Sequence, residues 1–131
     1  MLELVTHEEA IAHLRIDETA DDTWLAIFIP AISEAVAGWL KDSWRLYVPE
    51  TDGDGVVVVD SSGDPIPLED SNGYTVRPVV KAAVLLELSS VYRYREGEGK
   101  DNVVSDAAGY GYALNKASTA ILASLRKSTL A

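Results

Sequence analysis

The sequence predicts a mainly α-helical protein, a single four-helix domain over residues 1–131 with a small β insertion between the second and third helices. Four segments carry apolar residues at helical spacing. The stretch 44–76 instead holds short β-prone runs divided by Gly, Asp, Asn and Pro. A chain of 131 residues, 47% hydrophobic and 24% charged, suffices for one core but not for two, so we expect one folded domain.

The first helix is predicted to begin directly after Thr6. The sequence Thr6-His7-Glu8-Glu9 has the form of a capping box, in which the Thr6 hydroxyl accepts a first-turn amide and Glu9 bonds back to the Thr6 amide. Apolar residues follow near helical spacing up to Ile16, and the acidic stretch 17–21 ends the helix.

The second helix is predicted from Asp21 or Asp22 to about Lys41. Pro30 lies inside it and lacks the amide that would bond to the Ala26 carbonyl, so we expect a kink or a restart there. The residues assigned to its core-facing stripe are Trp24, Leu25, Phe28, Ile32, Ala35, Val36 and Trp39.

The β insertion is expected at about 44–76, with no internal repeat elsewhere or within it. Its predicted strands are 45–48, 56–59, 66–68 and 74–76, and its predicted turns are 52–55, 61–65 and 70–73. Between Leu46 and Val76 the sequence has seven acidic residues and no basic one. Much of the net charge of -10 is therefore concentrated in this segment.

The third helix is predicted from Pro78, a residue favoured at the first helical position, to about Arg95. It should be the central helix. Its expected inner face is Val80, Ala83, Val84, Leu88 and Val91. A long loop should occupy most of 97–113, and a fourth helix should run from about Asn115 to Lys127.

Several kinds of chemistry are disfavoured by the sequence, and we expect no cofactor, no metal and no catalysis. Without cysteine there are no disulfides or thiolate ligands. His7 and His13 are six residues apart, which does not match a helical zinc pair. Residues 52–55 lack the later oxygen ligands of a calcium loop, and Gly109-Tyr110-Gly111 lacks the third glycine of a phosphate-binding loop.

No segment predicts a membrane span or a signal peptide, since no run reaches about eighteen apolar residues and the N-terminus carries acids. We therefore expect no membrane contact. The net charge of -10 also disfavours binding to the outside of a nucleic acid, because phosphate affinity comes mainly from Lys and Arg.

Glu87 is the charged residue that helical spacing places within the apolar stripe of the third helix. A buried carboxylate is costly unless it is paired. The partner could be an arginine of the same subunit, and the candidates are Arg15, Arg45 and Arg77. It could equally be an arginine of a neighbouring subunit, and the sequence leaves both open.

A second apolar surface is predicted on the second and third helices. Ile27, Ile29, Leu40 and Trp44 fall off the core stripe of the second helix, while Leu85 and Tyr92 lie round the circumference of the third. Large apolar groups on a second face indicate either a further core layer or a protein contact, and the small size of the domain favours the contact. We therefore expect these residues, with Glu87, to form a contact with another protein subunit.

The order and spacing of the motifs resemble the phage head-tail connector, or adaptor, proteins of the HK97-type long-tailed phages. The resemblance covers nearly the whole chain and departs from it at the three tryptophans and Pro30. The motifs that carry it are Leu14-Arg15-Ile16-Asp17, Asp21-Asp22-Thr23-Trp24-Leu25, Arg77-Pro78-Val79-Val80-Lys81-Ala82-Ala83-Val84-Leu85-Leu86, Tyr92-Arg93-Tyr94-Arg95-Glu96-Gly97 and Leu122-Ala123-Ser124-Leu125-Arg126.

This resemblance implies a structural role in the phage neck. It implies a closed ring of about a dozen copies of this chain, a heterologous assembly beneath the portal protein, through which DNA passes as cargo. It also implies contact with a tail or stopper protein, with assembly in the host cytoplasm. In the family the C-terminal segment engages the portal, which here corresponds to Arg126, Lys127 and Leu130.

Two other functions stay open from the sequence. One is another virion or prophage interaction module, such as a tail-completion protein. The other is an enzyme that uses carboxylates of the β insertion, although exposed acids without burial are usually only solvated.

Overall fold

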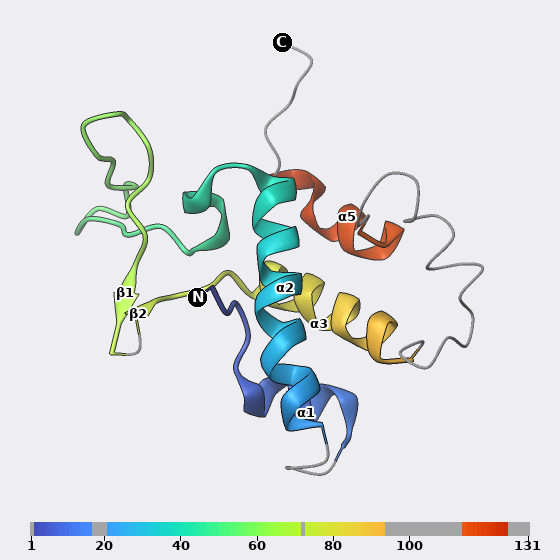
Figure 1. Ribbon diagram of the computed structural model, residues 1–131. Helices are drawn as coiled ribbons and strands as arrows, with labels where there is room; N and C mark the ends of the chain where they lie inside the picture. Colours follow the sequence, from blue (N-terminus) through green and yellow to red (C-terminus); the bar gives the residue numbers. More distant parts are fainter. Residues whose placement is uncertain (1, 17–20, 72, 94–113, 126–131) are drawn as a thin grey trace.

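The computed structural model describes residues 2–16, 21–71, 73–93 and 114–125. Its elements in chain order are α1 (His7–Leu14), α2 (Asp22–Leu40), the 3-10 turn η1 (Ser43–Leu46), β1 (Glu69–Asp70), β2 (Gly73–Tyr74), α3 (Pro78–Arg93), α5 (Lys116–Leu122) and the 3-10 turn η2 (Ala123–Leu125). The predicted fold class is confirmed, because four helices surround one core and a small antiparallel sheet lies between α2 and α3 (Figure 1). The expected loop at 97–113 lies outside the described residues.

The N-terminal capping box is confirmed. The Thr6 hydroxyl accepts from the Glu9 amide at 3.0 Å, and Glu9 Oε1 accepts from the Thr6 amide at 2.9 Å. The helix ends at Leu14. The next residue, Arg15, has a left-handed backbone, and the amides of Arg15 and Ile16 both bond to the Ile11 carbonyl. The segment before α1 is fixed in the core by the buried Ser33, whose Oγ accepts the Leu4 amide at 3.0 Å.

Helix α2 runs without interruption through Pro30, so the predicted restart is wrong. The missing amide of Pro30 removes one hydrogen bond, whereas the helix buries a full apolar face, and that burial outweighs a single lost bond. By length and composition alone α2 would also pass as a membrane span, with a mean hydropathy of 1.5. Of its apolar window, 39% is buried against the rest of the molecule, and helices in the core of other proteins can pass the same test.

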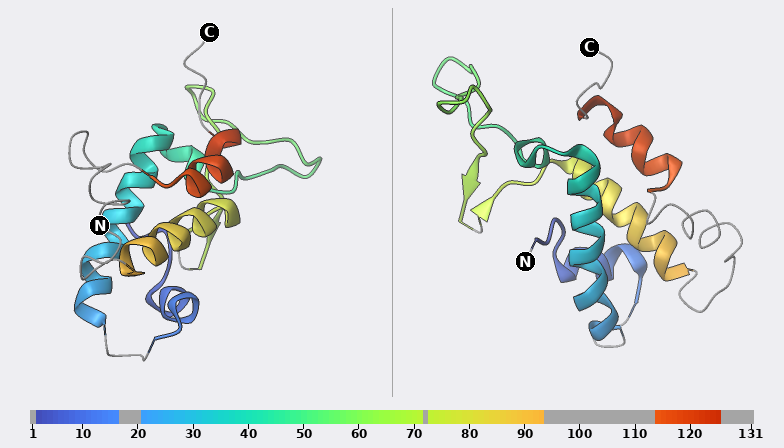
Figure 2. Two further views of the ribbon diagram at one scale, coloured as in Figure 1. Left: turned by 90° about the vertical axis from the view of Figure 1, so that its right-hand side faces the viewer. Right: turned by 45° about the horizontal axis from the view of Figure 1, so that its top comes forward.

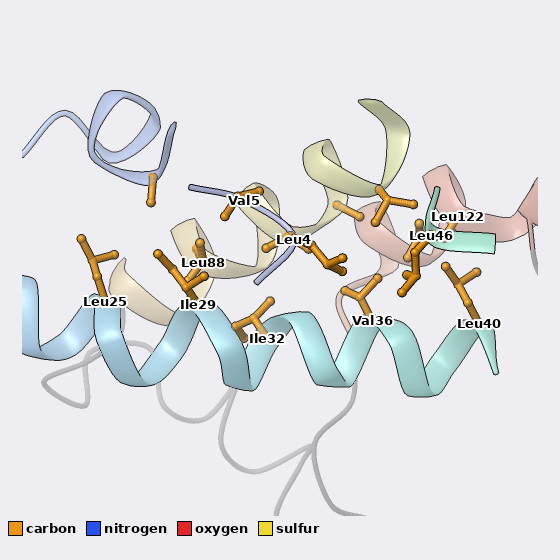
Figure 3. Packing of buried hydrophobic residues seen from close by; sticks show 14 residues of the cluster. Leu4, Val5, Leu25, Ile29, Ile32, Val36, Leu40, Leu46, Leu88 and Leu122 are labelled. Atoms are coloured by element: carbon orange, nitrogen blue, oxygen red, sulfur yellow. The ribbon is translucent and has the colours of Figure 1, made fainter. Parts of the chain in front are cut away.

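The core-facing side of α2 is rotated from the predicted stripe. Figure 3 shows the side chains that point from α2 toward α3, α5 and the N-terminal segment, namely Leu25, Ile29, Ile32, Val36 and Leu40. Ile29 is 3% exposed and Leu40 is 0% exposed, so the expectation that these two lie outside the core is wrong. Trp24, Phe28 and Trp39 pack at the margin of the core and are only partly buried.

Helix α3 is central, as predicted, and it packs against α1, α2 and α5. Four of its five expected inner residues are buried, Val80, Ala83, Val84 and Leu88, whereas Val91 is partly exposed. Pro78 is the first residue of the helix, in agreement with the prediction. The fourth helix corresponds to α5 and η2, which begin one residue later than expected.

The β insertion (residues 47–76) projects from the helical part of the molecule in all three ribbon views (Figures 1 and 2). The predicted strand at 45–48 is wrong in its first half, because Ser43–Leu46 form a 3-10 turn. Among the described residues, regular strands occur only at 69–70 and 73–74, and the other β-prone runs form isolated bridges. These bridges are Tyr47 with Val76, Pro49 with Pro67, Thr51 with Val57, and Val59 with Pro65.

Backbone hydrogen bonds tie the segments of the insertion together in rings of three. The Glu50 amide donates to Ile66, the Ile66 amide to Val58 and the Val58 amide to Glu50, at 2.8, 3.0 and 2.9 Å. A second ring joins Val48, Thr75 and Leu68 in the same manner, each bond at 2.8 Å. The short hairpins therefore radiate from two hydrogen-bonded junctions rather than lying in one flat sheet.

Two hairpin turns in the insertion are built alike, which the sequence analysis missed when it found no repeat. In each an aspartate Oδ1 accepts the amides two and four residues later: Asp52 from Asp54 and Val56, and Asp60 from Ser62 and Asp64. A glycine with φ of 79° or 85° stands three residues after each aspartate. The same Asp-x-x-Gly spacing occurs at Asp70 and Gly73, where Gly73 has a φ of 117°.

Candidate subunit interface

An exposed apolar stripe lies on the outer side of α2. Trp24, Ile27, Phe28 and Ala31 share one face by their spacing, and Ile27 is 59% exposed. Within the described part of the chain, Ile27 is the exposed large hydrophobic side chain outside the β insertion. Trp24 and Phe28 stack with ring centroids 4.6 Å apart. The sequence predicted both rings to lie in the core, whereas they lie at its margin on the neighbouring side of the helix.

Tyr92 of α3 completes an aromatic group at the same end of the molecule. Its ring meets Trp24 edge-on with centroids 5.2 Å apart, and its hydroxyl donates to Asp21 Oδ2 at 2.7 Å. Asp21 precedes α2 but makes no side-chain capping bond, and its Oδ2 accepts the Tyr92 hydroxyl. The structure thus brings the predicted residues Ile27 and Tyr92 to one aromatic surface, through Trp24 and Phe28.

The remaining predicted interface residues are distributed differently. Ile29, Leu40 and Glu87 are enclosed within the chain itself and have no surface to offer a neighbour. Leu85 is partly buried and packs against the core. A large apolar residue near the helix margin was indistinguishable from a core residue in the sequence, because α2 is apolar over more than one face.

Trp44 forms a second partly exposed patch beyond the C-terminal end of α2. The Arg45 guanidinium lies 4.4 Å from the centre of the Trp44 ring. Arg45 also donates from Nε to Asp42 Oδ2 at 3.0 Å and from Nη1 to the Leu125 carbonyl. These contacts join η1 to η2, so Trp44 is held on a braced part of the structure.

Glu87 is 1% exposed, and its Oε1 accepts the Asn115 amide at 2.6 Å. For this oxygen the expected arginine is replaced by the amide of the residue that caps α5. A carboxylate is favourable at a helix N-terminus, where unpaired amides and the helix dipole supply partial positive charge. Sequence reasoning could not find this partner, because amides carry no side-chain signature.

Three side-chain contacts pair a basic residue with an acidic one among the described residues. His7 Nε2 lies 2.8 Å from Asp22 Oδ1, and Lys81 Nζ lies 2.8 Å from Glu9 Oε2. Burial raises the pKa of Glu9, but the hydrogen bond from Lys81 and those from Thr6 outweigh it, so the pKa lies below its ordinary value. The third pair is Arg45 with Asp42.

Burial and the nearby Tyr74 raise the pKa of Tyr47 at the base of the insertion. The two rings lie with centroids 5.1 Å apart.

Among the described residues, no group of three or more His, Asp or Glu side chains is placed to hold a metal ion. The predicted portal residues Arg126, Lys127 and Leu130 lie outside the described residues.

Comparison with known proteins decides the family. A model of the phage gp6-like head-tail connector protein family matches residues 5–126, nearly the whole chain. The chain belongs to this connector family. Comparison with curated proteins and with solved structures gives no significant match.

As a head-tail connector, the protein is a structural component of the phage neck and interacts there with portal and tail proteins. The connector family is a structural family and not a family of enzymes. The resemblance noted from the sequence is therefore confirmed at the level of this family.

Proposed function

We propose that the connector assembles into a closed ring of about a dozen copies that joins the portal to the tail, as HK97-type adaptors do, and lets DNA pass through its centre. The observation that carries the proposal is the outer stripe of α2, where Ile27 is 59% exposed between two partly buried aromatic rings. A lone soluble domain gains nothing from this exposure, whereas a sister subunit would cover it.

A closed ring needs two different patches on each copy, since every interface joins one side of a subunit to the other side of the next. Two partly exposed apolar patches lie on the described helical part of the surface. One is the Ile27 and Tyr92 surface, and the other is the Trp44 surface beyond the opposite end of α2. We propose that these meet between neighbours, with Leu85 at the margin.

The contacts proposed with the portal, the tail and DNA are argued from the C-terminal segment and from the net charge. Arg126, Lys127 and Leu130 are proposed to engage the portal, and a tail or stopper protein would bind the opposite side of the ring. The net charge of -10 disfavours adhesion to DNA phosphates, which suits a channel through which DNA must slide. Assembly is proposed to take place in the host cytoplasm.

The ring is tested by negative-stain electron microscopy and sedimentation of the connector, alone and with purified portal protein. Ile27→Asp should abolish the rings, because it places a charge in the proposed contact. Ala12→Asp is the matched control, since Ala12 is also exposed on a helix but lies outside both patches. Raising NaCl from about 0.05 M to about 0.5 M should favour rings if the acidic segments face one another.

Strict monomers or hexamers in the presence of portal protein would contradict the ring and favour a tail-completion role. The enzyme alternative has less support, because Asp52 and Asp60 are engaged in holding their own turns. Substituting Asp52, Asp54, Asp60 and Asp64 together by Asn should leave ring formation intact.

A further inference from the structure

A row of exposed valines lies on one segment of the β insertion. Val56, Val57 and Val59 are 60%, 40% and 52% exposed. Leu68 and Tyr74 are also exposed, so the insertion holds most of the exposed large hydrophobic side chains in the described part of the chain. Apolar side chains gathered on one projecting feature usually mark a protein contact.

The same segment has an open backbone edge. The Val58 amide donates to Glu50, and the Val58 carbonyl accepts from Ile66. By contrast, the amide and carbonyl groups of Val57 and Val59 make no hydrogen bond with any described residue. Unpaired groups beside exposed β-branched side chains form an edge to which a further strand can add.

The turns on either side hold this edge in place. Asp52 fixes the turn before Val57, and Asp60 fixes the turn after Val59, each through two accepted amides. Val58 is anchored between them in the hydrogen-bonded ring with Glu50 and Ile66. An incoming strand would therefore meet a preformed edge and would not have to order it.

The charge around the edge selects the kind of strand that can bind. Seven acidic residues and no basic residue lie between Leu46 and Val76, and all seven are exposed. A second copy of this insertion would bring like charges together, and nucleic acid would also be repelled. A strand flanked by lysine or arginine would be attracted.

We propose that the edge at Val57–Val59 binds an extended, basic segment of another neck protein, which adds to the insertion as a β-strand. The proposal deepens the neck function proposed above and rests on it, because it assigns a heterologous partner to the insertion and leaves sister copies to α2.

The test uses the full-length connector with the purified portal protein and, separately, the purified stopper protein encoded by the same phage or prophage. Val57→Thr with Val59→Thr removes the apolar surface but keeps β-branched side chains. Val57→Pro with Val59→Pro removes two amides that have no internal partner. Each pair should weaken binding to one of the two proteins by about tenfold or more, measured by calorimetry.

The matched control is Val56→Thr, which changes a valine that is more exposed than Val57 and Val59 but precedes the open edge, and whose amide is already bound by Asp52. It should change the affinity by less than about twofold. Binding should also weaken as NaCl rises from about 0.05 M to about 0.5 M, opposite to the expectation for the ring.

Unchanged affinity in both double variants would overturn the proposal, as would a wild-type connector that binds neither protein. Loss of self-association with retained portal and stopper binding would also overturn it, because the occupant would then be a second copy. Ring formation by the wild type is scored separately, so rings without edge-dependent binding would refute this inference alone. Absence of rings on the portal would refute the proposed function.

Discussion

The helical part and the β insertion are stabilised in different ways. All fourteen buried hydrophobic residues of the core come from the segments 4–46 and 80–122. The insertion contributes none of them and is held instead by backbone hydrogen bonds and aspartate-capped turns. Apolar burial is the dominant favourable term in folding, so the global stability of this connector should depend on the helices.

Because the two regions are stabilised differently, the helices can determine the stability of the chain while the insertion is available for recognition. Exposed valines and acids in the insertion can change without opening the core, because none of the fully buried core side chains belongs to the insertion, and only its base, at Tyr47 and Val76, packs against the core. Recognition surfaces are often carried on such connecting segments, positioned by a rigid scaffold. Substitutions in the two regions should therefore give effects of different size and different kind.

The largest expected effect is from Leu88→Ala in the centre of α3. Leu88 is fully buried, so the substitution should lower the free energy of unfolding by about 2–5 kcal/mol. Val56→Ala in the insertion should lower it by less than about 0.5 kcal/mol. Urea unfolding followed by circular dichroism measures both. Comparable losses at the two sites would show that the insertion shares the core's stability.

Glu87→Ala should follow, at about 2 kcal/mol, because it leaves the Asn115 amide without the carboxylate that it meets at 2.6 Å. Glu87→Gln keeps a neutral acceptor and should cost about half as much. In hydrogen-exchange experiments on Glu87→Ala, the backbone amides of α5 should exchange faster, and those of α1 should be affected less. Equal losses for the two variants would mean that a neutral acceptor cannot replace the carboxylate of Glu87.

Asp60→Ala should act locally within the insertion. It removes the acceptor of the Ser62 and Asp64 amides, so these two amides should exchange about tenfold faster, a change near 1.4 kcal/mol in local opening. The global free energy of unfolding should change by less than about 0.5 kcal/mol. Ser61→Ala, an exposed change in the same turn, serves as the control. A cooperative loss of global stability would remove the distinction between the two regions.

The smallest effect concerns Glu9 and pH. Because the folded-state pKa of Glu9 is lowered, its carboxylate stabilises the fold above the unfolded-state pKa. That contribution is lost as the pH falls through the folded-state value. Glu9 is partly exposed, so we expect less than about 1 kcal/mol, reduced further by salt.

Glu9→Gln should flatten the dependence of stability on pH between about pH 5 and pH 3. Glu3→Gln, an exposed acid outside α1, is the control. An unchanged slope in the Glu9 variant would show that the pair with Lys81 does not stabilise the fold.

Local sequence signals predicted local structure well. The capping box at Thr6, the helix start at Pro78 and the position of the β insertion were all recovered, because each depends on a few adjacent residues. The uninterrupted helix at Pro30 was missed, since tertiary burial overrides a single lost hydrogen bond.

It was harder to predict which side of a helix faces the core and which groups form hydrogen bonds with one another. Helix α2 is apolar over most of its circumference, so the sequence does not show which side faces the core. For this reason Ile29 and Leu40 were predicted to lie outside the core. The Asn115 amide that bonds to Glu87 Oε1 was missed, because a backbone amide 28 residues away has no signature in the sequence. Of the candidate interface, Ile27 was located correctly as exposed, while the aromatic rings beside it emerged only from the structure.

The base of the insertion explains how this architecture can vary. The Arg77 amide bonds to the Leu46 carbonyl at 2.9 Å, and Tyr47 bridges Val76 directly above. The two ends of the insertion therefore leave the helices side by side, as the two legs of a hairpin do. Hairpins beyond this base could therefore be inserted, deleted or exchanged while α2 and α3 keep their places. A related phage could adapt this neck protein to a different partner by replacing the insertion alone.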